Sequence, residues 1–121
     1  MSEVSAFPSS KVPVECAVAP FACSCDIDGV GSACLHVEGE LDLANVPTFK
    51  RVLRGAQSET ETVSLDLREL AFIDCSALKE ILDADAFAHR MERTLTLVRG
   101  SGQVDRVMAL TGVLERMEVV G

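Results

Sequence analysis

Near its centre the chain contains Val63-Ser64-Leu65-Asp66-Leu67, in which apolar and polar residues alternate without a break. Because successive side chains of a β-strand point to opposite faces of the sheet, the three apolar residues share one face. This pattern predicts a strand with one face against a hydrophobic core. Ala71-Phe72-Ile73 continues the strand towards a turn at Asp74.

Helical patterns lie on both sides of this strand. Before it, Asn45 is a suitable N-cap, and Pro47 fits the first helical turn, where its missing N–H is harmless. After it, we expect a helix over residues 76–90, with Glu80 on its outer side. Each helix has an apolar stripe, formed by Val46, Phe49, Val52, Leu53 and Ala56 in the first and by Leu78, Ile81, Leu82, Ala86 and either Ala88 or His89 in the second.

Further elements extend this alternating order. A strand is expected at residues 94–98 and a short helix at 103–110, while residues 113–120 fit either a last helical turn or a strand. Two short runs, 22–27 and 33–37, flank a glycine-containing turn and predict a β-hairpin. Strands that alternate with helices imply parallel pairing through right-handed crossovers, so the hairpin adds an antiparallel edge.

These elements predict a single α/β domain over residues 21–121, which is an ordinary domain size. We expect a mixed, mostly parallel sheet of four to five strands with an antiparallel edge hairpin, and three to four helices on one side of it. Residues 1–20 hold three prolines and four serines, which predict a flexible lead-in. Within this lead-in, Val12-Pro13-Val14 is able to lie along the domain as an edge.

The charge of the chain narrows the classes of partner. Its formal net charge is -8, and it has no cluster of Lys or Arg. Proteins that bind nucleic acids need a basic face to displace counterions from phosphates, so we expect no direct DNA or RNA binding. No apolar run approaches the roughly 20 residues that span a bilayer, and the start has no signal-peptide pattern. We therefore expect a cytoplasmic protein without a membrane partner.

The cysteines and histidines predict no metal site and no cofactor. The five cysteines are irregularly spaced, and no second pair or nearby histidine completes a zinc set around Cys23 and Cys25. His36 lies in an expected strand and His89 in an expected helix, each without a companion ligand in the sequence. Because no nucleophile and base stand in one motif either, we expect a protein that is not an enzyme.

Three local sequences carry a resemblance to a known family. They are Gly39-Glu40-Leu41-Asp42-Leu43-Ala44, the stretch from Val63 to Asp74, and Val104-Asp105-Arg106-Val107-Met108-Ala109-Leu110-Thr111-Gly112. In this order and spacing they resemble the STAS family, and specifically the bacterial anti-sigma factor antagonists, over about residues 22–120. The resemblance implies a STAS-like fold for the predicted domain.

The resemblance also implies a mechanism. Such antagonists bind an anti-sigma factor with serine kinase activity, and this binding releases a sigma factor and so regulates transcription. The kinase phosphorylates a serine at the start of the second helix, the phosphorylated antagonist dissociates, and a serine phosphatase restores it. The alternative is a STAS module that senses or scaffolds without phosphorylation in a stress-signalling complex.

This chain departs from the family pattern at the phosphorylated loop. The family usually has Asp-Ser-Ser-Gly-Leu, whereas this chain has Asp74-Cys75-Ser76-Ala77-Leu78. Cys75 occupies the usual phosphoacceptor position, and Ser76 is the candidate phosphoacceptor, unless it only caps the helix. Cys75 is also a candidate redox switch, because a helix N-terminus favours a thiolate, although Asp74 opposes it.

The expected partner-binding surface lies where the strands end. The carboxyl ends of parallel strands meet at one edge of a sheet, which brings the loop after Glu40 to the loop at Asp74. Asp42 either orients the loop before the first helix or contacts the partner. The residues expected to bind the partner are Glu40, Asp42, Asp74, Cys75, Ser76, Ala77 and Lys79.

Overall fold

The computed structural model describes residues 12–14, 21–28 and 30–120. The strands are β1 (Val12–Val14), β2 (Phe21–Ile27), β3 (Ser32–Leu41), β4 (Thr62–Ile73), β5 (Thr94–Val98) and β6 (Glu118–Val120). The helices are α1 (Val46–Glu59), α2 (Cys75–Arg90), α3 (Gly102–Leu110) and α4 (Val113–Arg116). Within the described residues the strands form one sheet in the order β1-β2-β3-β4-β5-β6.

The predicted fold class is confirmed. The β2–β3 hairpin is antiparallel, and the pairs β3–β4, β4–β5 and β5–β6 are parallel. The described part of the sheet has six strands where four to five were expected, because a short strand extends each edge. One is β1, which pairs with β2 from within the expected lead-in, while residues 1–11 and 15–20 lie outside the described residues. The other is β6, so residues 113–120 form both a helical turn and a strand.

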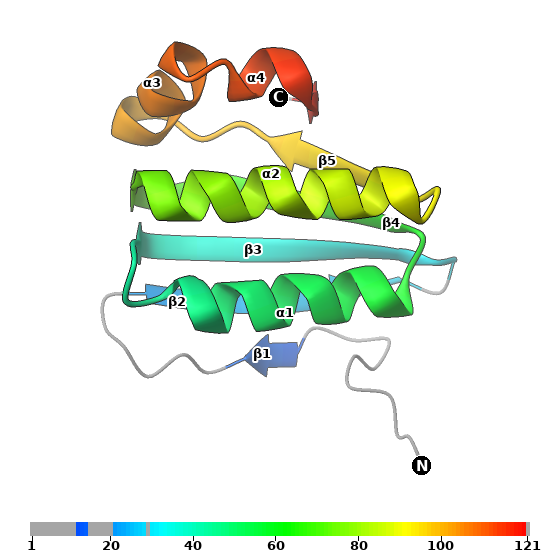
Figure 1. The fold of residues 1–121 in the computed structure, drawn as a ribbon. Helices are drawn as coiled ribbons and strands as arrows, with labels where there is room; N and C mark the ends of the chain where they lie inside the picture. Colours follow the sequence, from blue (N-terminus) through cyan, green and yellow to red (C-terminus); the bar gives the residue numbers. More distant parts are fainter. Residues whose placement is uncertain (1–11, 15–20, 29, 121) are drawn as a thin grey trace.

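The core lies between one face of the sheet and the first two helices. Figure 1 shows α1 and α2 running side by side across this face. Leu35, Leu65 and Leu97 occupy neighbouring strands and are fully buried, as are Phe49 of α1 and Ile81 of α2. Burying one such side chain contributes roughly 1.5–3 kcal/mol, so this layer supplies much of the driving force for folding.

The buried stripe of α2 differs in part from the predicted one. Ala88 is buried, as one of the two predicted alternatives, but Ala84 is buried in place of Ala86, which is exposed. Glu80, which we expected on the outer side, is 6% exposed and accepts a hydrogen bond of 3.2 Å from Arg54 of α1. The helical stripe is therefore rotated towards α1, because the two helices pack against each other as well as against the sheet.

The opposite face of the sheet is polar. Its side chains in β2 to β5 are partly exposed and include Ser24, Cys34, His36, Ser64 and Thr96. Asp66 lies on the same face but is only 4% exposed. Among the described residues, no helix combines the length and the apolar character needed to cross a membrane.

Candidate functional site

The α2 N-terminal site consists of residues 74–77 and the adjoining turn at residues 42–44. Asp74 has extended backbone and is the N-cap of α2, which begins at Cys75. Its Oδ1 atom accepts hydrogen bonds from the Ala77 N–H at 3.1 Å and from the Ser76 hydroxyl at 2.6 Å. The interpretation of Ser76 as the cap is therefore wrong, because Asp74 satisfies the helix N–H and Ser76 lies inside the first turn.

The two predicted loops are joined by hydrogen bonds. Asp74 Oδ2 accepts a hydrogen bond of 3.0 Å from the Leu43 N–H. The Asp74 N–H donates to the Leu41 carbonyl at 3.2 Å. A single residue thus caps α2 and fixes the turn that leads into α1, as the parallel strands led us to expect.

The turn into α1 is also held from within. Asp42 Oδ1 accepts from the Ala44 N–H at 3.1 Å and from Asn45 Nδ2 at 3.2 Å, and Asn45 Nδ2 also donates to the Glu40 carbonyl at 2.7 Å. Asn45 occupies the N-cap position of α1 as predicted, but its side chain makes no capping bond to the helix. Asp42 therefore orients this turn.

Gln103 of α3 holds the backbone directly before the cap. Its Nε2 donates to the Ile73 carbonyl at 3.1 Å, and its Oε1 accepts from the Ile73 N–H at 3.1 Å. Through these two bonds the side-chain amide pairs with the backbone at the end of β4, as a neighbouring strand would. Gln103 was not predicted as a site residue, because nothing in its local sequence pattern distinguishes it from a surface glutamine.

The predicted partner-binding residues differ in exposure. Glu40, Cys75 and Lys79 are exposed, Asp42, Asp74 and Ser76 are half-buried, and Ala77 is fully buried. The Ala77 side chain packs in the core, so its part in the site is the N–H that it donates to Asp74. Lys79 forms an ion pair of 3.2 Å with Asp83 on the outer face of α2.

Two apolar side chains that were not predicted from the sequence border the α2 N-terminal site. Leu43 is 72% exposed and Phe72 is 37% exposed, whereas Leu41, two residues before Leu43, is fully buried. Phe72 lies in β4 beside Glu40 of β3. Isolated apolar residues at a surface are ordinary, but here they adjoin the hydrogen-bonded pair of loops.

The electrostatics of the cap favour an ionised Asp74. Partial burial raises its pKa, but the Ser76 hydroxyl and the N–H groups of Ala77 and Leu43 donate to the carboxylate and lower the pKa by more. The net pKa lies below the ordinary value for Asp. Asp74 therefore carries a full negative charge near neutral pH, directly beside the Ser76 hydroxyl.

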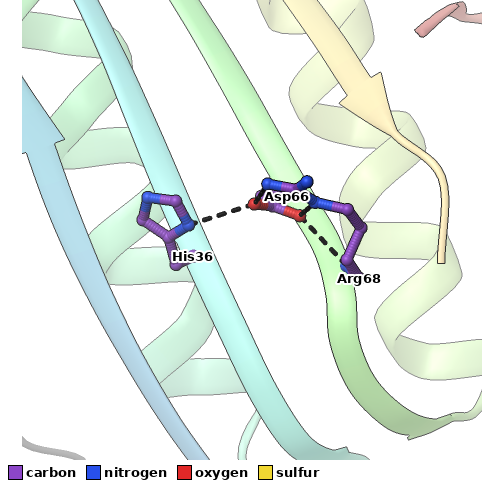
Figure 2. Close-up of polar contacts among 3 residues, drawn as sticks. All are labelled: His36, Asp66 and Arg68. Carbon is purple, nitrogen blue, oxygen red and sulfur yellow. Dashed lines mark hydrogen bonds and ion pairs between the residues drawn. The ribbon is translucent and has the colours of Figure 1, made fainter. Parts of the chain in front are cut away.

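A second polar cluster occupies the open face of the sheet. In Figure 2, His36 of β3 points towards Asp66 of β4, and Arg68 folds back onto the same carboxylate. His36 Nδ1 lies 3.1 Å from Asp66 Oδ2, and Arg68 donates from Nε to Oδ1 at 3.0 Å and from Nη2 to Oδ2 at 2.8 Å. We call His36, Asp66, Arg68 and the neighbouring Cys34 the sheet-face cluster.

The hydrogen bonds from the Arg68 side chain are the largest cause of a lowered pKa at Asp66, which falls to about 2 despite the opposing effect of burial. The ligand atoms of Cys34, His36 and Asp66 all lie within 4.8 Å of one another. The expectation that His36 has no companion ligand is therefore wrong. Its companions come from the same strand face and from the adjacent strand, whose register the sequence did not reveal.

The fold is a small α/β domain. At one edge of its sheet, hydrogen bonds of Asp74 hold two loops together, and these loops form a continuous surface. The model of the STAS domain family matches residues 26–120. The chain belongs to the STAS family, and the predicted resemblance is confirmed. Comparison with the curated proteins found no matching sequence.

Solved structures of anti-sigma factor antagonists share this fold. The antagonist SpoIIAA in its unphosphorylated form superimposes with a TM-score of 0.66 and 16% identity, over 83% of this chain and 88% of that chain. A putative antagonist from Thermotoga maritima superimposes with a TM-score of 0.67 and 21% identity, over 73% of this chain and 77% of that chain. An antagonist from Mycobacterium paratuberculosis superimposes with a TM-score of 0.65 and 19% identity, over 93% of this chain and 86% of that chain.

Proposed function

We propose that this protein is a cytoplasmic anti-sigma factor antagonist that binds an anti-sigma factor of the serine-kinase type and so releases a sigma factor. The observation that carries the proposal is the pair of loops joined through Asp74, which presents Cys75 and Ser76 beside exposed apolar side chains. STAS family membership and the shared fold of anti-sigma factor antagonists support the class of partner.

The surface has the composition of a binding site for a protein. Leu43 and Phe72 offer apolar contact area, and Glu40 and Asp42 offer acidic groups around it. Apolar side chains that become buried at the centre of an interface supply most of its binding energy, while rim charges mainly set partner choice and association rate. An anti-sigma factor with a basic rim and an apolar centre matches this surface.

Ser76 is the proposed phosphoacceptor. Transfer of the γ-phosphoryl group to Ser76 Oγ breaks the bond between the β- and γ-phosphates of ATP and releases ADP. It also breaks the hydrogen bond that this hydroxyl donates to Asp74, and the hydroxyl proton leaves to a base of the kinase or to solvent. The phosphate adds about 1.5 to 2 negative charges at pH 7. Although the N-terminus of α2 favours an anion, the charge lies directly against the Asp74 carboxylate. The resulting repulsion strains the bond between Asp74 and Leu43 and disturbs the partner surface.

The alternative function is a sensing or scaffold module that uses the same surface without phosphorylation. Cys75 at the usual acceptor position favours it, as does the half-buried Ser76 hydroxyl, which already donates to Asp74. In this alternative the exposed Cys75 thiol offers a redox input.

The test combines a binding assay with intact-mass measurement. The protein is incubated with ATP, Mg²⁺ and each candidate anti-sigma kinase, and complexes are recovered by pull-down. Without ATP we expect binding. With ATP we expect addition of one phosphoryl group and loss of binding, and this group should be absent in Ser76→Ala but present in the control Ser64→Ala on the open sheet face. A serine phosphatase should then restore binding.

The remaining outcomes separate the two functions. Binding without phosphoryl transfer would retain the antagonist and withdraw the Ser76 switch, and Cys75→Ser, which restores the usual family residue, should then gain phosphorylation. Absence of binding to every such kinase would overturn the antagonist proposal in favour of the scaffold.

A further inference from the structure

We propose that Cys34, His36 and Asp66 form a binding site for a thiophilic divalent metal ion, with Zn²⁺ as the reference ion. The site lies on the open face of the sheet and is independent of the antagonist function. Its three side chains supply a thiolate sulfur, an imidazole nitrogen and a carboxylate oxygen. These are the three ligand types that bind Zn²⁺ in proteins.

The sheet geometry brings the three ligands together without a loop. Cys34 and His36 stand two residues apart on β3 and so share one face. Asp66 is the direct partner of His36 in β4, and Ser64 is the partner of Cys34. All three ligand atoms lie within 4.8 Å of one another. The site is therefore built on two central strands, which hold side chains more rigidly than loops do.

The distances suit a tetrahedral ion with little rearrangement. Zinc bonds to nitrogen and carboxylate oxygen are about 2.0–2.2 Å, which places two such ligands roughly 3.3 Å apart at a tetrahedral angle. His36 Nδ1 and Asp66 Oδ2 are already 3.1 Å apart. Zinc–sulfur bonds are longer, about 2.3 Å, and the Cys34 sulfur lies within 4.8 Å of both other ligand atoms. The fourth position remains open to water.

Arg68 is compatible with this arrangement. A carboxylate offers about four lone-pair positions, and Arg68 bonds to both oxygens through its side chain and to Oδ1 through its N–H. The ion takes the place of the proton between His36 Nδ1 and Asp66 Oδ2. The imidazole then carries its proton on Nε2, and the thiol proton passes to solvent. Since the Arg68 side chain is 66% exposed, it is free to stay on Oδ1 and orient the carboxylate.

An acidic hollow leads to the site. It has a volume of about 310 Å³ and includes Cys34 in its lining, together with Asp26, Asp28, Ser32, Ala33 and Ser64. The two carboxylates in its lining concentrate cations near the thiol, and the net charge of -8 acts in the same direction. The half-buried Cys34 and His36 are thus reachable by a hydrated ion.

The experiment uses the reduced full-length chain and two probes. Co²⁺ reports the ligands, because thiolate ligation gives near-ultraviolet charge-transfer absorption and tetrahedral geometry gives intense visible bands. Zn²⁺ affinity is measured by competition with a chromophoric chelator. We expect the cobalt spectrum of a tetrahedral site with one thiolate, and stoichiometric displacement of cobalt by zinc.

The variants identify the ligands. Cys34→Ser and His36→Gln should each weaken Zn²⁺ binding by at least about 100-fold, because each removes a direct ligand. Cys75→Ser and His89→Gln are the matched controls, since both original side chains are exposed, and Cys16→Ser tests a cysteine outside the described residues. These three controls should leave the affinity unchanged.

Two results would overturn the site. One is the absence of a thiolate band with Co²⁺ in the wild type, and the other is loss of the band in Cys75→Ser or Cys16→Ser instead of Cys34→Ser. The metal affinity of Asp66→Asn is interpreted only if circular dichroism shows that this variant is folded, because Asp66 also binds Arg68. Failure of the metal site leaves binding and phosphorylation at α2 untouched, so the two proposals are tested separately.

Discussion

The α2 N-terminal site and the sheet-face cluster are each organised by one aspartate, but the donors that surround the two aspartates differ. Asp74 accepts from two backbone N–H groups and one hydroxyl, which are neutral groups that belong to local loops. Asp66 accepts from the guanidinium and the backbone N–H of Arg68 and from His36, which stands on the neighbouring strand. Asp74 therefore mainly holds backbone in place, whereas Asp66 mainly brings charged side chains together.

The difference teaches which contacts depend on local sequence and which on strand register. The cap that Asp74 gives to α2 is defined within a few residues, whereas its bond to Leu43 also needs β3 and β4 to lie side by side. A cluster across two strands exists only if both strands are paired in one register, since a shift by one residue moves every side chain to the other face. The variants below test this contrast.

The largest effect is expected for Asp74→Ala, which should lower the free energy of unfolding by about 2–3 kcal/mol, measured by urea denaturation. The change removes the helix cap, which contributes about 1 kcal/mol, and leaves the Leu43 N–H and the Ser76 hydroxyl without their acceptor. Asp74→Ser is the matched control, because serine keeps a cap but does not reach Leu43. If Asp74→Ser were as stable as the wild type, the joining of the two loops would not be a separate contribution.

A smaller and pH-dependent effect is expected for Asp66→Asn. Near pH 7 it should cost about 1–2 kcal/mol, because the charge-assisted bonds from Arg68 and His36 are lost while both donors regain water. The pKa of Asp66 is about 2 in the folded protein, below that of the unfolded chain. Its contribution is therefore complete above about pH 4 and disappears as the pH falls towards 2.

The stability gap between wild type and Asp66→Asn should accordingly shrink between about pH 4 and pH 2, where the native carboxylate becomes protonated. Urea denaturation at several pH values measures the gap. Asp83→Asn is the control, because its ion pair with Lys79 is exposed and contributes little at any pH. A gap that stays constant down to pH 2 would mean that Asp66 acts by packing and not by charge.

Gln103→Ala should cost about 1–2 kcal/mol, since it removes two hydrogen bonds to Ile73. Hydrogen exchange at the Ile73 amide should accelerate, because that N–H loses its acceptor. Gln103→Glu keeps the acceptor oxygen and should preserve the protection of this amide, although the bond to the Ile73 carbonyl is lost. Equal exchange in the two variants would show that the side-chain amide does not hold the end of β4.

The sequence predicted the order of the elements, the antiparallel hairpin and the two loops at the sheet edge, because hydrophobic periods and turn residues are local signals. It misplaced the cap, since Asp74 and Ser76 are both good capping residues and the local pattern does not say which of them accepts the helix N–H. It missed the sheet-face cluster and the rotation of Glu80 towards Arg54 for a different reason. Both depend on which strand or helix lies alongside, and no local pattern records that.

The smallest effect on stability, and the sharpest test of the partner surface, is expected for Leu43→Ser. Leu43 is 72% exposed, so its replacement should change the free energy of unfolding by less than about 0.5 kcal/mol. Affinity for the cognate anti-sigma factor should nevertheless fall at least about tenfold, because an apolar contact at the interface is lost. Leu110→Ser is the matched control: Leu110 is 80% exposed on α3, so its loss removes a similar apolar area elsewhere. Equal losses of affinity in the two variants, measured by calorimetry, would move the interface away from the loops that Asp74 joins.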